Sequence, residues 1–414
     1  MAKYDQLGKV AALTVAGAFC GALPYSAVAA DSLEAALKES TTKLNLRPRY
    51  ENVEVDSGTS EALTLKTRLT FTTGSFYDVS AVLEFDDVTS LKSVDYLDGT
   101  NGLSGPPIVD PEGTEVNQAF LSYKGLDSTD LSWGRQRIVL DNQRFIGGVA
   151  WRQNEQTYGS FAASNSSVEN LKLFYGYIYN VNRIFGEQSA AGRHAHETHL
   201  VNVNYTIGGI GSISGYYYDI DNQDVAGLSN ATMGVRFAGA TDLSSVKLGY
   251  ELEYADQQES GDAPDYSADY LLASISGTMS GFTLGVAHEV LGADTDIGKG
   301  FTTSLATLHK FQGWADKFLG TPGTGIEDTY ITFKAGLPMG MSFTAVFHDF
   351  ESAEDTGTMG SDFGSEIDVS LAKKFSNGAS VLLKYADFSG EEGAAFANAR
   401  SDVTKIWIMA NYAI

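Results

Sequence analysis

The feature that most constrains this 414-residue chain is a series of about eighteen short segments in which apolar and polar residues alternate. In residues 245–254, for example, Val246 and Leu248 fall on one face, while Lys247 and Glu251 fall on the other. A side-chain period of two is that of a β-strand, and each such strand has one face suited to lipid and one suited to water. A soluble β-sandwich can contain any one of these strands, so the connections must decide the fold.

The connections are alternately short and mostly longer, counted from a first strand near residues 44–55. The short gaps lie around 73–75, 125–127, 164–166, 208–209, 240–241, 279–280, 337–339 and 376–378, and the gaps between them are 87–114, 139–151, 181–196, 221–229, 258–265, 291–326, 353–361 and 391–400. Bacterial barrels place tight turns on the periplasmic side and long loops outside. The pattern predicts an all-β transmembrane antiparallel β-barrel of about 18 strands, with short periplasmic turns, long extracellular loops and both ends in the periplasm.

Composition agrees with this fold class and excludes some partners. The chain has 21 Tyr, 22 Phe and 44 Gly but only 8 Pro, and no long apolar stretch follows residue 30, which argues against a transmembrane helix. The net charge of −24 excludes nucleic acid as a partner. We expect the excess acid on exposed loops near lipopolysaccharide.

The start of the chain has the form of an export signal. Lys3 and Lys9 precede an apolar run at 11–23, and small residues at 27–30 are suited to a signal peptidase. We therefore expect a signal peptide at 1–30, a periplasmic N-terminal segment at 31–43 and the transmembrane barrel at 44–414. The predicted location is the outer membrane of a bacterial cell, and the expected partners are its lipid, its lipopolysaccharide and the barrel-assembly machinery.

Few residues suggest catalysis or a cofactor. The single cysteine, Cys20, lies within the signal, and no Gly-x-Ser-x-Gly motif or evident His–Ser pair is present. His194 and His196 share a strand face, but histidines scattered on a surface are the simpler interpretation. We predict no enzyme, no cofactor and no metal site.

Two blocks of sequence point to a family. The first comprises Trp133-Gly134-Arg135-Gln136-Arg137, residues 141–147 and Trp151-Arg152-Gln153-Asn154, and the second is residues 301–319. In this order, within an apparent barrel, they resemble the alginate export family of outer-membrane porins. The resemblance implies an eighteen-stranded monomeric barrel with a positively lined pore that passes anionic solutes.

The positions of the cations support such a lining independently. Nine of the eleven arginines fall between Arg47 and Arg193. Because Arg135 and Arg137 share the parity of Trp133, we expect a β-bulge at Gly134 that turns both arginines inward. The predicted pore-lining or substrate-binding residues are Arg47, Arg49, Lys66, Arg68, Arg135, Arg137, Arg144 and Arg152. The alternative is that these cations pair with acidic residues and only brace the wall.

Two long loops are candidates for a constriction or lid. The loop around 139–151 is expected to fold into the lumen, held by Asp141, Asn142 and Gln143. In the loop at 291–326, apolar residues from Leu305 onward recur at three-residue spacing, which predicts a short amphipathic helix. This helix either narrows the pore or packs on the extracellular rim. Its polar and aromatic residues that would border the solute path are His309, Lys310, Trp314, Asp316 and Lys317.

The sequence therefore predicts a porin with a water-filled, arginine-lined passive channel for small hydrophilic anionic solutes, such as acidic sugars or carboxylates. Arginine suits this purpose because its planar fork makes two parallel hydrogen bonds to a carboxylate and stays charged. One alternative is a dedicated exporter of an anionic, alginate-like polysaccharide. A more distant alternative is an adhesin or phage receptor. The identity of the solute and the direction of transport stay open.

Overall fold

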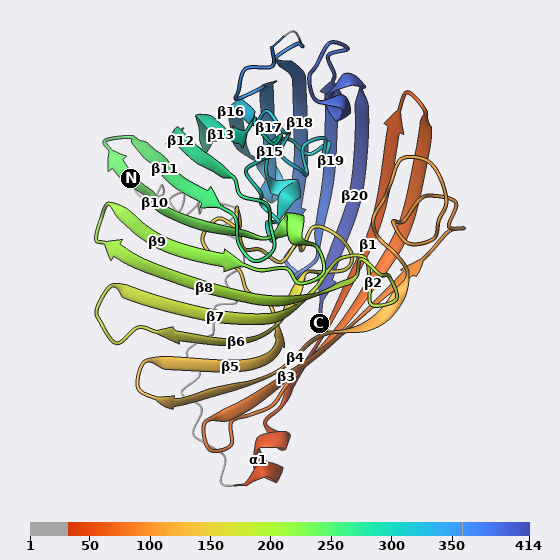
Figure 1. The fold of residues 1–414 in the computed structure, drawn as a ribbon. Helices are drawn as coiled ribbons and strands as arrows, with labels where there is room; N and C mark the ends of the chain where they lie inside the picture. Colours follow the sequence, from red (N-terminus) through yellow and green to blue (C-terminus); the bar gives the residue numbers. More distant parts are fainter. Residues whose placement is uncertain (1–31, 358) are drawn as a thin grey trace, which may run out of the picture.

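The computed structural model describes residues 32–357 and 359–414, and most of them belong to one closed sheet of 18 antiparallel strands. Each strand pairs with the next along the chain, and the last strand pairs with the first, which closes the barrel (Figure 1). The predicted fold class is therefore confirmed. The expected export signal at 1–30 lies outside the described residues.

The elements follow one another as a simple up-and-down series. The strands of the wall are β1 (Thr41–Val55), β2 (Gly58–Thr72), β3 (Val79–Ser90), β4 (Gly113–Leu126), β5 (Thr129–Gln136), β6 (Thr157–Asn165), β7 (Leu171–Asn182), β8 (Arg193–Ile207), β9 (Gly211–Ile220), β10 (Asn230–Leu243), β11 (Val246–Gln258), β12 (Ser267–Met279), β13 (Phe282–Leu291), β16 (Ile326–Leu337), β17 (Met341–Glu351), β18 (Asp362–Lys374), β19 (Ser380–Ser389) and β20 (Val403–Ala413). The remaining elements are the ribbon of β14 (Ala293–Asp294) and β15 (Lys299–Gly300), the helix α1 (Leu33–Lys38) and the short 3-10 helices η1 (Ala226–Leu228), η2 (Leu308–Lys310), η3 (Pro338–Gly340) and η4 (Ala397–Arg400). Among the described residues, no helix is long and apolar enough to cross a membrane.

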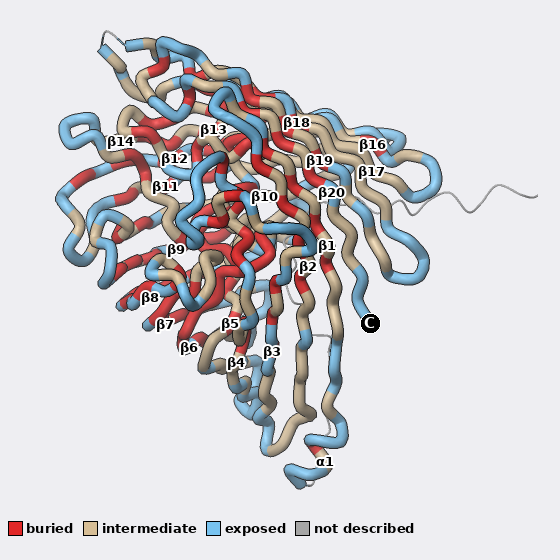
Figure 2. Tube along the Cα trace, turned by 90° about the vertical axis from the view of Figure 1, so that its right-hand side faces the viewer, coloured by how far each residue is buried: buried red, intermediate tan, exposed pale blue. Residues whose placement is uncertain are grey.

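Alternation along the strands separates an outer from an inner face. On β11, Leu252 and Tyr254 point outward and are 56% and 50% exposed, whereas Glu253 and Ala255 between them are buried inside the barrel. In Figure 2 the buried positions gather where the strands surround the interior, while the ends of β1 and β2 near α1 are intermediate or exposed. The exposed apolar face of the isolated chain is therefore the surface that meets lipid.

The connections also follow the predicted asymmetry. The turns on the side of α1 are short, and most connections at the other end are longer, with the tight turn between β1 and β2 as an exception. Helix α1 begins after Ser32, whose hydroxyl accepts a hydrogen bond from the backbone N–H of Ala35 at 3.1 Å. Strand β1 starts at Thr41, so the barrel begins slightly before the predicted residue 44.

The lipid face of the barrel gives a first prediction. We expect Leu252→Arg, in the middle of β11, to destabilise the membrane-inserted barrel by about 2–4 kcal/mol, because a guanidinium placed in hydrocarbon loses its hydration. Gln258→Arg, on the same face at the extracellular end of β11, is the matched control and should cost about 0–1 kcal/mol. Denaturant-induced unfolding in lipid vesicles measures both. Equal losses for the two variants would contradict the assignment of the membrane-facing surface.

Candidate pore constriction

Two long connections fold into the barrel, and we name them the first inward loop (137–156) and the second inward loop (292–325). The first begins at the end of β5 and reaches β9, where the Ser214 hydroxyl donates to Asp141 at 2.7 Å. Farther along, Arg47 on β1 donates to Gln153 at 2.9 Å. Seven strands separate β1 from β9 on one side of the closed wall and nine on the other. The first inward loop therefore crosses the lumen.

Other residues of the first inward loop contact the far wall. Asn142 donates to Glu251 on β11 at 3.0 Å, and the Arg144 guanidinium lies 2.9 Å from Glu289 on β13. Gln143 accepts a hydrogen bond from Thr307 of the second inward loop at 2.8 Å. All three residues predicted to anchor this loop, Asp141, Asn142 and Gln143, thus make contacts inside the barrel.

The second inward loop lies inside the barrel against β18–β20. The backbone N–H groups of Trp314 and Ala315 donate to Asp368 at 3.1 Å and to Glu366 at 2.7 Å, both on β18. Asp316 accepts from Lys405 on β20 at 3.0 Å. Of the two placements that the sequence left open, the structure shows the loop within the lumen and not on the rim.

The predicted amphipathic helix in this segment is wrong. The only helical stretch between 301 and 319 is η2, of three residues. Leu305, Ala315 and Phe318 are buried as a helix face would be, but the chain that carries them is irregular. Gly313 has φ of 78°, and a Cβ there would lie 2.3 Å from a Glu366 oxygen, so the chain needs glycine to approach β18.

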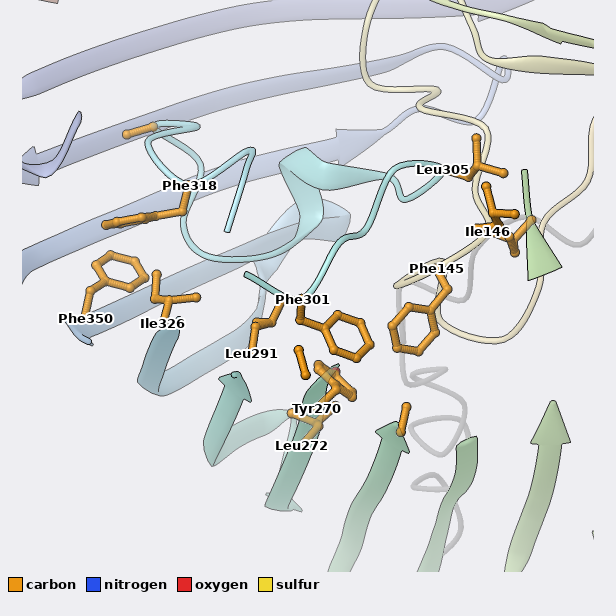
Figure 3. Packing of buried hydrophobic residues seen from close by; sticks show 14 of the residues in the cluster. Phe145, Ile146, Tyr270, Leu272, Leu291, Phe301, Leu305, Phe318, Ile326 and Phe350 are labelled. Atoms are coloured by element: carbon orange, nitrogen blue, oxygen red, sulfur yellow. The ribbon is translucent and has the colours of Figure 1, made fainter. Parts of the chain in front are cut away.

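The two inward loops pack on each other through apolar side chains. Figure 3 shows Phe145 and Ile146 of the first loop beside Phe301 and Leu305 of the second, with Tyr270 of β12 below them. The ring centroids of Phe145 and Phe301 are 5.8 Å apart. The backbone N–H of Gly147 also donates to the carbonyl of Leu305 at 2.9 Å. The loops therefore form one body within the lumen.

A lysine enclosed by tryptophans fixes this body to the wall. The Lys384 ammonium on β19 lies 4.3 Å from the ring centroid of Trp151 in the first loop and 3.7 Å from that of Trp314 in the second. Its nitrogen is 2.6 Å from the Nε2 atom of His309, whose ring stacks on Trp151 at 4.3 Å. Cation–π contacts gain strength when the cation is desolvated, as here. One buried cation therefore joins both loops to β19.

The His309 ring is neutral at this site. Burial lowers the pKa of His309 to about 3, although the Asp316 carboxylate at 2.7 Å acts in the opposite direction. A neutral imidazole accepts a hydrogen bond at Nε2 while Nδ1–H donates, which matches Lys384 on one side and Asp316 on the other. Protonation would place two cations in contact.

Most of the predicted cations are paired with carboxylates. Arg49 lies 2.7 Å from Glu51, and Arg152 lies 3.0 Å from the same carboxylate. Arg68 pairs with Asp86 at 2.6 Å, and Lys66 lies 3.9 Å from Glu155. Such buried pairs hold the loop and the wall together, because removing one partner leaves an uncompensated charge.

Arg47 departs from this pattern, and Arg137 follows it but is less buried. Arg47 donates to Gln153 and to the backbone carbonyls of Ala150 and Arg152, so it holds the first inward loop without a carboxylate. Arg137 pairs with Glu84 and Glu155, yet its side chain remains 28% exposed, against 15% for Arg68. Burial alone would raise the pKa of Glu155, but Arg68, Arg137 and Lys66 hold that pKa well below its usual range.

Arg135 is not where the sequence placed it. The register of β5 with both neighbours is unbroken through Gly134, so the expected bulge there is absent, and Arg135 keeps the outward parity of Trp133. Its guanidinium pairs with Glu115 and Glu187, and the residue borders a shallow groove with Trp133 and Leu121. Arg137 faces inward because β5 ends at Gln136 and the chain turns into the lumen.

Of the remaining predicted residues, some anchor the second inward loop and some stay exposed. Lys317 donates to the carbonyl of Ser401 at 2.8 Å, and Lys310 donates to the carbonyl of Asn142 at 2.7 Å while its side chain stays exposed. His194 and His196 are buried and bond to Asn222 and Thr198. Within the described ranges, no group of three or more His, Cys, Asp or Glu side chains is arranged to hold a metal ion.

Several residues that anchor the inward loops were not predicted from the sequence. Glu51 shares strand parity with Arg47 and Arg49, and that signal was available. Lys384 and Lys405 lie on inward faces of β19 and β20, but their partners His309 and Asp316 come from the second inward loop, far away in sequence. Arg236 on β10 pairs with Glu251 on the adjacent β11. Nothing local in the sequence predicts that Lys384 contacts Trp151 and Trp314.

Comparisons with known proteins identify the family to which this barrel belongs. The sequence profile of the family described as alginate export matches residues 49–285. The chain belongs to the alginate export family. A comparison with curated proteins gives no match. As a member of this family, the chain is a porin-like barrel of the outer membrane, and it is not an enzyme.

Solved structures from Pseudomonas aeruginosa share the fold of this alginate export family member. OccK11 (OpdR) is 16% identical with a TM-score of 0.68, over 91% of this chain and 96% of that one. OpdK with vanillate is 14% identical with a TM-score of 0.69, over 91% and 99%. OccK5 (OpdH) is 14% identical with a TM-score of 0.69, over 92% and 99%. At these identities the likeness establishes the barrel and not the solute.

The shared carboxylate of Glu51 gives a prediction for the constriction. Glu51→Gln should destabilise the barrel by about 3–5 kcal/mol, because Arg49 and Arg152 both lose a buried partner. Unfolding in denaturant measures the change. Glu34→Gln, which breaks an exposed pair with Lys38 on α1, is the matched control and should change stability little. An unchanged unfolding midpoint for Glu51→Gln would contradict the bracing role.

The neutral His309 gives a pH dependence. The unfolded chain binds a proton near pH 6.5 and the folded chain only near pH 3, so His309 stabilises the fold fully above pH 6.5 and progressively less as the pH falls toward 3. Between pH 6 and pH 4 this group should contribute up to about 1.4 kcal/mol per pH unit.

We expect His309→Gln to flatten that slope when the free energy of unfolding is measured across the same pH range. His288→Gln, on the outer wall, controls for the loss of a histidine as such. Parallel slopes for wild type and His309→Gln would show that His309 is not held neutral.

Proposed function

We propose that this barrel is a passive channel for small hydrophilic anionic solutes, such as acidic sugars or carboxylates. The observation that carries the proposal is that both inward loops keep cations that are not fully buried, among them Arg137 on the first and the exposed Lys310 on the second. Cations that line a narrow path favour anions, and conduction requires that each contact be weak enough to release the solute. Two accessible cations in succession satisfy both requirements.

The deeper arginines have a different part in this proposal. Arg49, Arg68 and Arg152 are paired with carboxylates, so we assign them to holding the first inward loop in place. Their charge is largely balanced locally. Arg137 also pairs with Glu84 and Glu155, but it is less buried than they are, and we assign the sign of the selectivity to Arg137 together with the exposed Lys310. The fold neighbour OpdK, whose structure contains vanillate, offers a carboxylate-bearing solute as a precedent within this fold.

A second candidate function is the export of an anionic polysaccharide, which the description of the family names. The packing of the inward loops favours a small solute instead. A polymer chain would have to displace a body that Glu51, Lys384 and Asp368 tie to three parts of the wall. Because the chain belongs to the alginate export family, we also propose that the channel works as a monomer, and closure of β20 on β1 means that one chain suffices to enclose the lumen.

The test is the reversal potential of single channels in planar bilayers under a salt gradient. We expect anion selectivity in the wild type and a several-fold lower anion-to-cation permeability ratio in Arg137→Gln/Lys310→Gln. The control Lys38→Gln/Lys92→Gln removes two cations outside the lumen, each in an exposed ion pair, and should leave the ratio unchanged. Cation selectivity in the wild type would overturn the proposal.

The polymer alternative needs its own measurement. Vesicles loaded with alginate chains and carrying the wild-type protein should retain the polymer while losing a monomeric uronate. Release of the polymer at a comparable rate would favour the exporter and reject the small-solute channel.

A further inference from the structure

Two acidic residues on the inner face of β18 hold the second inward loop against the wall. Glu366 accepts a hydrogen bond from the backbone N–H of Ala315 at 2.7 Å, and Asp368 accepts one from that of Trp314 at 3.1 Å. Both side chains are buried, at 1% and 0% exposure. Residues two apart on a strand point to the same side, so the two carboxyl groups lie next to each other under the loop.

The two carboxyl groups are also within hydrogen-bond distance of each other. Each has one oxygen, Oε2 of Glu366 and Oδ1 of Asp368, to which no N–H or O–H group of the described residues donates. Two carboxylates have only acceptors, so a hydrogen bond between them requires that one group keep its proton. Like charges in contact cannot both ionise at ordinary pH, and a buried acceptor without a donor costs free energy. One shared proton removes both costs.

Neighbouring cations do not replace this proton. The Nδ1 atom of His348 on β17 is 2.9 Å from Asp328 on β16, whereas its Nε2 atom is 3.7 Å from Asp368, beyond hydrogen-bond distance. Among the described residues, the Lys384 ammonium donates to neither acid and lies 2.6 Å from His309 instead. Other ionisable groups near the pair are Glu289 on β13 and Asp316 and Lys317 of the second inward loop.

The stretch of loop held by these acids is connected to the rest of the loop body. Trp314 lies against Lys384, whose ammonium also contacts Trp151 of the first inward loop. Asp316 accepts from Lys405 on β20 at 3.0 Å and lies 3.5 Å from Arg152 of the first inward loop. A displacement at Trp314 and Ala315 would therefore reach both inward loops.

We propose that one proton shared by Glu366 and Asp368 acts as a latch that holds the inward loops across the lumen. When this proton passes to bulk water at alkaline pH, two negative charges are left in contact, and their repulsion moves the carboxylates away from each other and from the loop. The loops then move more freely and the passage widens. Because the proton binds to the latched state, the latch is present at neutral pH and is lost as the pH rises. It requires only that the barrel conduct, whatever the sign of the selectivity proposed above.

The test is the single-channel conductance of the wild type and of Glu366→Gln in planar bilayers, from about pH 7 to about pH 10. The amide in Glu366→Gln can donate to Asp368 and accept from Ala315, so it reproduces the protonated pair at every pH. We expect the wild type to show higher conductance and several-fold larger current fluctuations toward alkaline pH, and Glu366→Gln to show neither change. The same pH response in both proteins would overturn the latch.

Two further variants protect this comparison. Asp368→Asn puts the permanent donor on the other acid and should abolish the same response, so the test does not depend on the folding of one variant. Glu391→Gln removes an exposed carboxylate from an extracellular loop and should respond as the wild type does. Lysines and tyrosines also titrate in this range, and a response that persisted in both amide variants would belong to them and reject the latch.

Infrared spectroscopy detects the shared proton without reference to conduction. At neutral pH, the difference spectrum between the wild type and Glu366→Gln should contain the C=O stretching band of one protonated carboxyl group. This band should disappear over the pH range in which the conductance rises. A difference spectrum without the band at neutral pH would show that both acids are ionised and would overturn the inference.

Discussion

Closure of the sheet between β1 and β20 is the constraint on which the rest of this molecule depends. Backbone N–H and C=O groups in a membrane must find partners within the protein, and an open sheet edge has none. Eighteen strands closed in this way enclose a space too wide for wall side chains to fill. Long connections can therefore enter the barrel, and the two inward loops do so.

A loop inside a barrel needs anchors at many points, and here charged side chains supply them. The first inward loop has arginines that reach carboxylates on β1 and β13, such as Glu51 and Glu289, and the second has Asp316, which reaches Lys405 on β20. Charged pairs of this kind hold the loops in place, and they add little to the electrostatic potential inside the barrel. The number of arginines inside the barrel is thus a poor guide to the charge that a solute would meet there.

The sequence sufficed for the barrel because the signal for it is local and repeated. Alternation along a segment such as β11 follows from one face meeting lipid and the other meeting the lumen, and it needs no knowledge of distant residues. The helix expected after Leu305 failed because three-residue spacing of apolar side chains is also produced by an irregular chain whose residues pack on several neighbours. Arg135 was misplaced because the prediction assumed a β-bulge at Gly134, whereas β5 keeps its register there and Arg135 follows the outward parity of Trp133.

What the sequence could not supply is the set of contacts across the lumen. The pairing of Arg152 with Glu51 spans about a hundred residues, and the enclosure of Lys384 joins segments that no periodicity relates. These contacts decide which cations are engaged and which remain available. Arg137 has the same chemistry as Arg49, yet its side chain stays 28% exposed, while Arg49 is enclosed between Glu51 and Trp151. How far an arginine of this barrel is enclosed therefore depends on the fold of the inward loops and not on its position within a strand pattern.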